Sequence, residues 1–150
     1  MTRRVVWAGC GRHAEQMLLP QLMRHDVELA GVCDINRSAA DKVARRYGVK
    51  HVATDFDKLL ALPNIDIAGM AAGPVQHRDL SIAALQRGLH VFMEKPCGAS
   101  AADAHAIAVA AHAAKRTVGV GFMKRYATAN RIAHNVVKSA AFGPVIGFFG

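Results

Sequence analysis

The sequence predicts an α/β domain built on a doubly wound, mostly parallel sheet. Two observations carry this prediction. Apolar runs of strand length alternate along the chain with segments of helical period. Helices of that length between strands give right-handed crossovers, which make the strands parallel and cover both faces of the sheet. We expect this domain to span residues 1–122, and residues 123–150 to begin a second, truncated α+β domain.

Six short apolar runs are predicted as the strands of the sheet. Each is flanked by glycines or polar residues that are typical of turns and helix starts. The six runs are Val5–Cys10, Val27–Cys33, His51–Ala53, Ile65–Ala72, His90–Met93 and Thr117–Phe122.

Helices are predicted between these strands from capping residues and periodicity. Ser38, Thr54 and Ser100 are placed to cap helix N-termini, and Gly48 and Gly88 to end helices. The predicted helices are Arg12–Arg24, a segment from Ser38 to Tyr47, Asp55–Ala61, Val75–Arg87, a segment from Ser100 to Lys115, and Tyr126–Ala140.

The end of the sequence departs from this alternation. Val145–Gly150 reads as a further strand, and so apolar a strand would form a bare sheet edge if nothing covered it. We therefore expect the chain to be a fragment of a longer protein, although a partner covering that edge is the alternative.

Composition excludes several classes of protein. Hydrophobic residues make up 52% of the 150 residues and charged residues 20%, which is typical of a globular chain rather than a disordered one. No signal peptide or membrane span is predicted. Three widely spaced cysteines, Cys10, Cys33 and Cys97, predict buried thiols in a reducing compartment, so the expected location is cytoplasmic.

The formal net charge of +8 raises the question of an anionic partner. Nucleic-acid binding would require the cations to cluster with aromatic residues on one face, whereas here they are scattered along the chain. A basic surface that attracts anionic cofactors and substrates explains the sign equally well. We therefore predict small-molecule partners and no nucleic acid.

A glycine-rich segment, Gly-Cys-Gly-Arg-His-Ala, stands where the first strand gives way to a helix. Its first glycine permits a tight turn, and its second removes a side chain that would keep a phosphate from the backbone. Alanine is an accepted variant at the third position. The segment predicts a pyrophosphate held by free N–H groups at a helix start, with a plain structural turn as the alternative. The predicted contacts are Gly9, Gly11, Arg12, His13 and Ala14.

Asp34 ends the second predicted strand, twenty residues after Ala14. This is the offset at which an acid is expected to bind the adenosine ribose hydroxyls. Its carboxylate would repel a 2′-phosphate, which favours NAD over NADP. Arg37 can offset that charge or lie against the adenine ring, so NADP remains possible. Alternatively, Asp34 belongs to a polar turn that caps the next helix, and it can serve in both roles.

The segment HVFMEKPCG, residues 90–98, places a charged pair and a proline at the carboxyl end of a strand, where ligands of such folds bind. Together with AGCGRHA, CDINR and HRDLSIAALQRGLHVFMEKP, it makes the chain resemble the Gfo/Idh/MocA oxidoreductase family. The resemblance implies an NAD(P)-binding Rossmann domain of an enzyme. That enzyme would transfer hydride between nicotinamide and a CH–OH group of a sugar, polyol or related hydroxy compound.

The resemblance also implies roles for individual residues. Lys95 matches the active-site lysine that hydrogen-bonds the reacting hydroxyl, and its cation would stabilise a developing alkoxide. Glu94 matches an acid on the nicotinamide side of the cofactor, and Pro96 a proline often preceded by a cis peptide bond.

A turn after the fourth strand matches the family in part. Ala72-Gly73-Pro74-Val75-Gln76-His77 lacks the Thr or Ser hydroxyl that the family has before its proline, which puts that cofactor contact in doubt. Ala72, Gly73, Pro74 and His77 are still predicted to contact the cofactor.

Lys124 and Arg125 lie in a basic-aromatic segment where family members cross to their second domain, and either is predicted to touch substrate. The family's general base belongs to a motif beyond residue 150. The 150 residues alone are therefore expected to be catalytically incomplete, and a homo-oligomer is expected for the full-length form. A non-catalytic NAD(H)-binding or sensing module is the alternative function.

No metal site is predicted. His105 and His112 lie seven residues apart on one predicted helix, about 10.5 Å along its axis, which is too far to share one zinc ion. Cys97 has no activating partner in the sequence and is predicted to be a packing residue.

Overall fold

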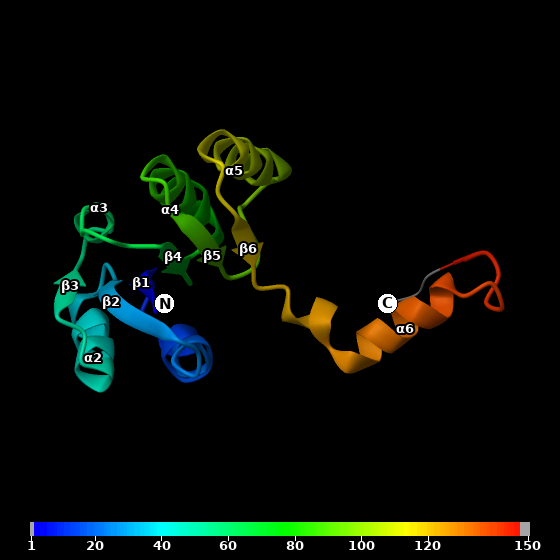
Figure 1. Cartoon of the computed structure of the whole chain (residues 1–150), viewed down its shortest axis with the longest axis horizontal. Coiled ribbons are helices and arrows are strands. Elements are labelled where there is room, and N and C mark those ends of the chain that lie inside the picture. The colour runs from blue at the N-terminus through cyan, green and yellow to red at the C-terminus, as the bar shows by residue number, and fades with distance from the viewer. Residues whose placement is uncertain (1, 148–150) are drawn as a thin grey trace.

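The computed structural model describes residues 2–147 and contains one six-stranded sheet whose neighbouring strands are all parallel. The strand order is β3-β2-β1-β4-β5-β6, so the chain leaves β1 in one direction and returns to its other side at β4 (Figure 1). This confirms the predicted doubly wound parallel sheet. The strands are β1 Arg3–Ala8, β2 Val27–Cys33, β3 His51–Ala53, β4 Ile67–Met70, β5 His90–Met93 and β6 Val118–Val120.

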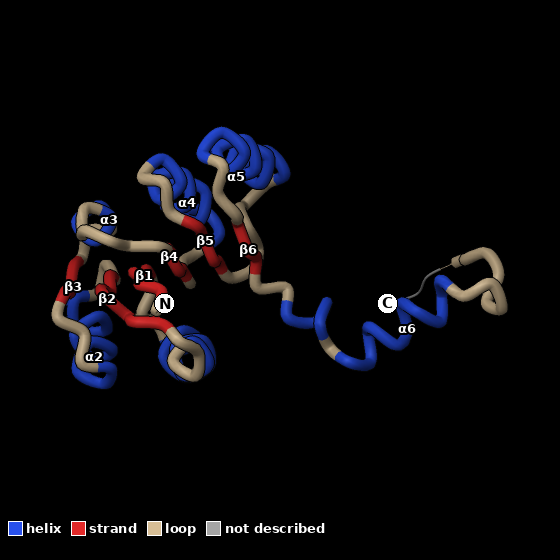
Figure 2. Tube along the Cα trace, in the orientation of Figure 1, coloured by secondary structure: helices blue, strands red, loops and turns tan. Residues whose placement is uncertain are grey.

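Helices cover both faces of the sheet, with α3, α4 and α5 on one face and α1 and α2 on the other (Figure 2). Two separate hydrophobic clusters fill the two interfaces. One joins Phe56, Leu85 and Ile107 to Val6 and Met70 of the sheet. The other joins residues of α1 and α2 to Trp7 and Val32. The helices are α1 Leu19–Leu22, α2 Arg37–Tyr47, α3 Asp57–Leu60, α4 Pro74–Gln86, α5 Ala101–Ala114 and α6 Thr128–Lys138.

The first helix differs from the predicted continuous segment Arg12–Arg24. A π-helical stretch, η1 Ala14–Leu18, precedes α1, and the Leu19 N–H bonds the Ala14 carbonyl five residues earlier. Pro20 explains the wider turn, because it has no N–H to donate to a carbonyl four residues before it. The helix therefore changes its hydrogen-bond register just before the proline.

Two of the three predicted N-caps are wrong. The Asn36 side chain, not Ser38, caps α2 by accepting from the N–H groups of Ser38 and Ala39. Thr54 does not cap α3, because an Asp55 carboxylate oxygen accepts from the Asp57 N–H at 3.1 Å and the helix begins later. Ser100 caps α5 as predicted, accepting from the Asp103 N–H at 3.1 Å.

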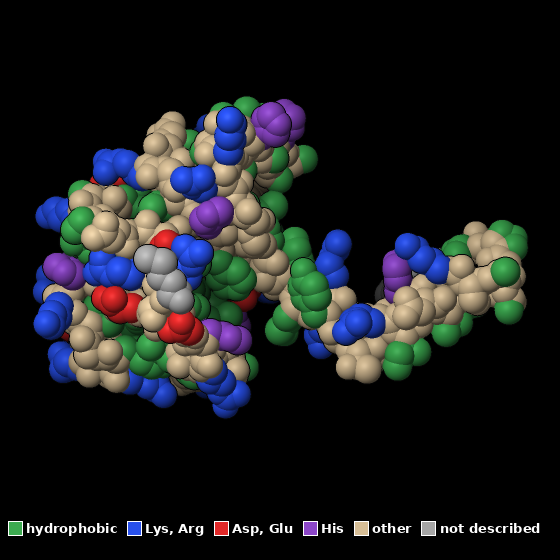
Figure 3. Space-filling model, in the orientation of Figure 1, with side chains coloured by type: hydrophobic (Ala, Val, Ile, Leu, Met, Phe, Trp, Pro, Cys, Tyr) green, Lys and Arg blue, Asp and Glu red, His purple; other side chains and the backbone are tan. Residues whose placement is uncertain are grey.

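The segment after the sheet extends away from the domain in both the ribbon and the space-filling view (Figure 1, Figure 3). It forms a short 3₁₀ helix, η2 Met123–Tyr126, and then α6, and none of its residues from 123 to 147 is buried. The predicted strand at Val145–Gly150 is absent from residues 145–147, and its last three residues lie outside the described residues. The division of the chain into two domains stays a prediction. Among residues 2–147, no helix is long and apolar enough to cross a membrane.

Asp66 directly precedes β4 and joins it to β1 at the amino ends of the two strands. Its carboxylate accepts from the Arg4 N–H at 2.8 Å and from the Arg3 guanidinium at 2.9 Å. These bonds, with that from the Arg4 N–H as the larger cause, lower the pKa of Asp66 from its ordinary value. The ionised carboxylate therefore stabilises the folded state.

We expect Asp66→Asn to lower the melting temperature at pH 7. Because the folded pKa is depressed, this contribution is complete above the unfolded pKa, near 3.9, and is lost as the pH falls through the folded value. The gap in melting temperature between the two proteins should therefore close on going from pH 5 to pH 2, as measured by circular dichroism. Asp79→Asn, which removes an exposed carboxylate on α4, is the control. A gap that persisted unchanged at pH 2 would contradict the assignment.

Candidate cofactor-binding site

A cleft of about 390 Å³ opens at the carboxyl ends of β1 and β4, where the strand order reverses. Ligands of open α/β sheets bind at this switch point. The cleft is lined by Ala8, Gly9, Gly11, Cys33, Asp34, Ile35, Thr54, Phe56, Ala71, Ala72, Gly73, Gln76 and Leu80.

The two glycines of the first turn have different surroundings. Gly9 has a φ of +89°, and a Cβ placed on it would lie 2.7 Å from the carbonyl carbon of Ala71. Gly11 has nothing within 4 Å of an added Cβ, so the space above it is open. Gly9 thus lets the chain turn tightly against the end of β4, and Gly11 leaves room for a ligand at the helix start. This is the cradle that a pyrophosphate requires.

Asp34 is held beside that turn by backbone groups. Its carboxylate accepts from the Cys10 N–H at 2.7 Å and from the Asn36 N–H at 2.8 Å. The side chain therefore joins the glycine turn to the loop after β2 and still lines the cleft. Each carboxylate oxygen has a second lone pair, so the same group can also accept from ribose hydroxyls.

The cations near this carboxylate are engaged elsewhere. Arg37 donates to Asp41 one turn along α2 at 2.9 Å, and Arg12 donates to Gln16 at 3.1 Å. Neither arginine lines the cleft. Asp34 thus has no arginine paired with it among residues 2–147, so no arginine there would offset its repulsion of a 2′-phosphate.

Glu94 brings the glycine turn and the Glu-Lys-Pro loop together. One of its carboxylate oxygens lies 3.4 Å from Nε2 of His13, and the other accepts from the Lys95 N–H at 3.0 Å. A Cβ on Gly121 would lie 3.0 Å from the Glu94 carboxylate, so this glycine makes room for it. Glu94 is thereby fixed with 13% of its side chain exposed.

Lys95 follows directly, and its side chain is exposed. The peptide bond between Lys95 and Pro96 is cis, as the resemblance implied. No hydrogen bond or ion pair of the Lys95 ammonium is found within the described part of the chain, so the group is free to donate to a ligand. Pro96 is also exposed.

His77 lies beneath the same loop and has no exposed surface. Its Nδ1 is 2.7 Å from the carbonyl oxygen of Pro96. Its Nε2 is buried and has no hydrogen-bond partner among the described residues. The imidazole therefore supports the loop that carries Lys95 from below, and in this structure it does not line the cleft.

The turn after β4 places backbone, rather than a hydroxyl, at the cleft. Gly73 caps α4 without a side-chain hydrogen bond, Pro74 begins the helix, and Ala72 lines the cleft. Gln76 also lines the cleft and was not predicted from the sequence. Its place in the segment Pro74-Val75-Gln76-His77, one residue before a buried histidine, is the signal that would have found it.

The buried cysteines at and beside the cleft, Cys33 and Cys10, are not activated as nucleophiles. Burial raises the pKa of Cys10 to about 12, and the nearby Asp34 carboxylate contributes to the rise. Burial and Asp34 likewise raise the pKa of Cys33 to about 11. Both thiols therefore stay protonated at neutral pH and act as packing groups. Within residues 2–147, no group of three or more His, Cys, Asp or Glu could hold a metal ion.

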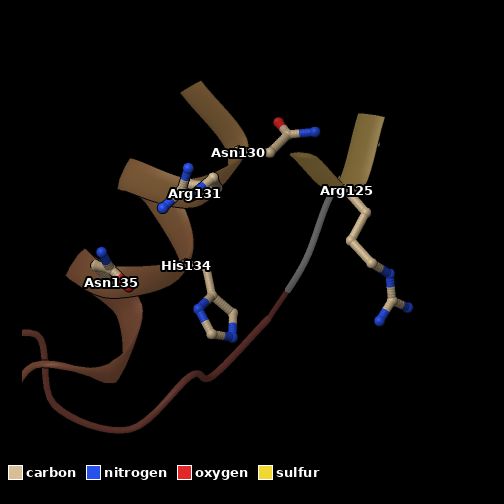
Figure 4. Close-up of a pocket in the computed structure, with 5 residues that line it drawn as sticks. All are labelled: Arg125, Asn130, Arg131, His134 and Asn135. Atoms are coloured by element: carbon tan, nitrogen blue, oxygen red, sulfur yellow. The ribbon is translucent and has the colours of Figure 1, made fainter. Parts of the chain in front are cut away.

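Lys124 and Arg125 lie apart from this cleft. Both belong to η2, which follows β6, and neither lines the cleft. Arg125 instead faces a second cavity beside α6 (Figure 4).

A glycine turn with positive φ, an open helix start and an acid at the end of β2 together define a dinucleotide-binding Rossmann domain. The chain belongs to the GFO_IDH_MocA family, described as an oxidoreductase family with an NAD-binding Rossmann fold, whose model matches residues 3–122. The predicted family resemblance and the predicted NAD cofactor are confirmed.

The individual proteins compared here are 27–30% identical to this chain. The chain is 28% identical over 134 residues to 4-carboxy-2-hydroxymuconate-6-semialdehyde dehydrogenase of a Sphingobium species, covering 89% of this chain and 42% of that protein. It is 30% identical over 119 residues to inositol 2-dehydrogenase of Salmonella typhimurium, covering 78% and 35%. Among solved structures, the WlbA dehydrogenase of Chromobacterium violaceum, in complex with NADH and UDP-GlcNAcA, has a TM-score of 0.85 at 27% identity, covering 91% and 40%. The chain thus spans about two fifths of the length of these proteins.

Proposed function

We propose that this chain is the coenzyme-binding part of an NAD-dependent dehydrogenase that oxidises a CH–OH group of a sugar, a polyol or a related hydroxy compound. The observation that carries the proposal is the contact between two loops that follow the carboxyl ends of β1 and β5. The glycine turn with Asp34 supplies a dinucleotide cradle, and His13 of that turn lies 3.4 Å from Glu94 of the loop that presents Lys95. Cofactor and substrate contacts are thereby brought side by side.

Bound NAD supplies the hydride acceptor in this reaction. The chain's own residues bind and orient it. The open helix start at Gly11 receives the pyrophosphate, and Asp34 accepts from the ribose hydroxyls. Glu94, fixed by the Lys95 N–H and next to His13, holds the nicotinamide side.

Lys95 polarises the substrate. Its free ammonium donates a hydrogen bond to the reacting hydroxyl oxygen and stabilises the negative charge that develops there as hydride leaves the carbon for NAD. The hydroxyl proton passes to the general base that the family resemblance places beyond residue 150. The buried imidazole of His77, through the Pro96 carbonyl, keeps this loop in place. His77 therefore acts as a positioning residue, and Lys124 or Arg125 contacts the remainder of the substrate. A pure sensor of NAD(H) would need no free lysine at this place, which favours an enzyme over the non-catalytic module.

The relatives support a small-molecule substrate but differ in its charge. The names of those matched here include inositol, which carries no charge, and a carboxylated semialdehyde. The proposed setting is the cytoplasm, because Cys10, Cys33 and Cys97 are free thiols. A homo-oligomer of a longer protein is part of the same proposal.

We expect the 150-residue chain to bind NADH with a dissociation constant in the micromolar range, as measured by nicotinamide fluorescence and calorimetry. Asp34→Ala should weaken NADH about tenfold relative to NADPH, because the repulsion of a 2′-phosphate is lost together with the ribose hydrogen bonds. The substitution also removes the acceptor of the Cys10 and Asn36 N–H groups, which weakens the binding of both coenzymes. The ratio of the NADH and NADPH affinities is therefore the readout, because this shared loss cancels in it. Asp79→Ala, which removes an exposed carboxylate that does not line the cleft, is the control.

Two results would overturn the proposal. A folded chain that responds to neither coenzyme at millimolar concentration would end the assignment of a dinucleotide site. Equal losses of NADH and NADPH affinity in Asp34→Ala would end the assigned preference for NAD.

A further inference from the structure

The cleft at the carboxyl ends of β1 and β4 contains little charge with which to hold an anion. Among the described residues that line it, Asp34 alone has a charged side chain, and that charge is negative. A dinucleotide brings a negatively charged diphosphate into this space. The diphosphate must therefore be met by neutral donors, namely backbone N–H groups such as those of the turn at Gly11, and polar side chains.

Three side chains that line the cleft can donate a hydrogen bond: Cys33, Thr54 and Gln76. The Cys33 thiol is buried and is a weak donor. Thr54 follows β3, on the same side of the cleft as Asp34, which is assigned to the adenosine ribose. Gln76 belongs to α4, which follows β4 on the other side of the glycine turn. Gln76 is therefore the side-chain donor on the β4 side of the cleft.

The amide of Gln76 is available to a ligand. The residue is exposed, and its backbone N–H donates to the Gly73 carbonyl at 3.0 Å in the first turn of α4. No hydrogen bond of the side-chain amide is found within residues 2–147. Both amide hydrogens can therefore be donated to a ligand in the cleft.

The orientation of this amide depends on Gly73. A Cβ placed on Gly73 would lie 2.6 Å from Oε1 of Gln76 and 3.7 Å from its Cδ, whereas Nε2 is not within 4 Å of that position. The amide oxygen therefore lies against the backbone of Gly73, and the amide nitrogen, which is the donor, is turned away from it.

The backbone at Gly73 does not itself require glycine. Its φ is −72° and its ψ is 159°, an extended conformation that any residue adopts. Gly9 differs, because its φ is positive and an added Cβ would meet backbone atoms. The contact that a side chain at position 73 would make is with the Gln76 amide. Glycine at this position thus serves the placement of Gln76 rather than the path of the chain.

We propose that Gln76 is a coenzyme-binding residue, and that its amide Nε2 donates a hydrogen bond to the diphosphate of NAD from the β4 side of the cleft. Gly73 makes room for the amide in that position. The inference rests on the proposed function and adds a contact to the same site. The diphosphate is then held between the turn at Gly11 and the first turn of α4.

Substitution of Gln76 is the first test, with affinities measured on the 150-residue chain by nicotinamide fluorescence for NADH and by calorimetry for ADP and AMP. Gln76→Ala should weaken NADH and ADP about tenfold, because a hydrogen bond to a charged acceptor is lost. Gln76→Glu keeps the shape of the side chain but replaces the donor by a carboxylate, so it should weaken both ligands further. Gln86→Ala removes the same amide from the exposed last residue of α4 and should leave the affinities unchanged.

The three nucleotides locate the contact of Gln76. A loss that NADH and ADP share supports a contact with the diphosphate. AMP then distinguishes its two phosphates, because AMP carries only the phosphate next to adenosine. A loss confined to NADH would place the contact on the nicotinamide half of the coenzyme and would overturn the proposal.

Gly73→Ala tests the role of the glycine. Its methyl group should displace the Gln76 amide and weaken NADH several-fold, while the melting temperature falls by no more than about 5 °C, because the methyl group meets only the end of a flexible side chain. In a Gln76→Ala background the same methyl group should cost little further affinity, since the amide is already absent. Equal losses in the two backgrounds would mean that the methyl group obstructs the coenzyme directly, which would refute the role assigned to Gly73.

Failure of this inference differs from failure of the proposed function. A folded Gln76→Ala protein with the NADH affinity of the unsubstituted chain would refute the contact with Gln76 and leave the dinucleotide site in place. If the folded, unsubstituted chain bound neither NADH nor ADP, the proposed function itself would be refuted. Circular dichroism melting curves establish that each variant is folded.

Discussion

Gly9→Ala is expected to destabilise the domain by roughly 2–5 kcal/mol and to lower its melting temperature by about 10 °C or more. The residue has a φ of +89°, where a side chain is strained, and a Cβ would press on the backbone of Ala71. The turn has little freedom to move away. The Gly9 N–H donates to the Cys33 carbonyl at 2.8 Å, and the Gly9 carbonyl accepts from the Trp7 indole at 2.8 Å.

Gly11→Ala is the matched control, because it adds the same methyl group two residues away. Nothing lies within 4 Å of that methyl group, so the melting temperature should change by no more than about 2 °C. NADH affinity should nevertheless fall about tenfold, because the methyl group enters the space that we assign to the pyrophosphate. Thermal denaturation and NADH fluorescence of both variants measure the two effects. A Gly11→Ala protein with unchanged NADH affinity would contradict the assigned phosphate position.

The sheet could be predicted from the sequence because its signals are local. All six apolar runs coincide with observed strands to within two residues at each end. The buried strands of a parallel sheet are continuous apolar runs, which stand out against the helical periodicity between them. The glycine turn and Asp34 were also predictable, because their spacing follows from the strand–turn–helix unit itself.

Contacts between distant segments could not be predicted. The approach of His13 to Glu94 joins residues 81 positions apart, and it depends on β1 and β5 lying on either side of β4. The burial of His77 below Pro96 depends in the same way on how α4 packs against β5. The predicted capping residues of α2 and α3 were wrong for a local reason. Several polar residues adjoin each helix start, and only the backbone geometry selects among them.

The cavity beside α6 illustrates a different limit. The individual cations Lys124 and Arg125 were noticed in the sequence, but the cavity depends on the position where α6 begins. The predicted helix begins at Tyr126, the last residue of η2, so the prediction contained neither the 3₁₀ turn that carries Arg125 nor the break after it. In the structure α6 begins at Thr128, and the break at Ala127 places the two segments opposite each other.

Lys95→Ala is expected to lower turnover by about a thousandfold in a parent protein that carries this sequence together with its substrate domain. We propose the lost ammonium as the group that stabilises the developing negative charge on the substrate oxygen, and removing one such donor costs about 10²–10³ in rate. NADH affinity should change by less than about threefold. The Lys95 side chain is exposed and supports no other described residue, whereas the backbone N–H that fixes Glu94 is retained in alanine.

The split between turnover and coenzyme binding is what identifies the role of Lys95. Lys58→Ala, at an exposed position on α3 away from the cleft, should leave both quantities unchanged. Lys95→Arg keeps the cation but moves its donors, so it should recover only a small part of the activity, because charge without the correct position does not polarise the reacting oxygen. If NADH binding collapsed together with turnover in Lys95→Ala, the lysine would be a coenzyme ligand, and another group would have to stabilise the alkoxide.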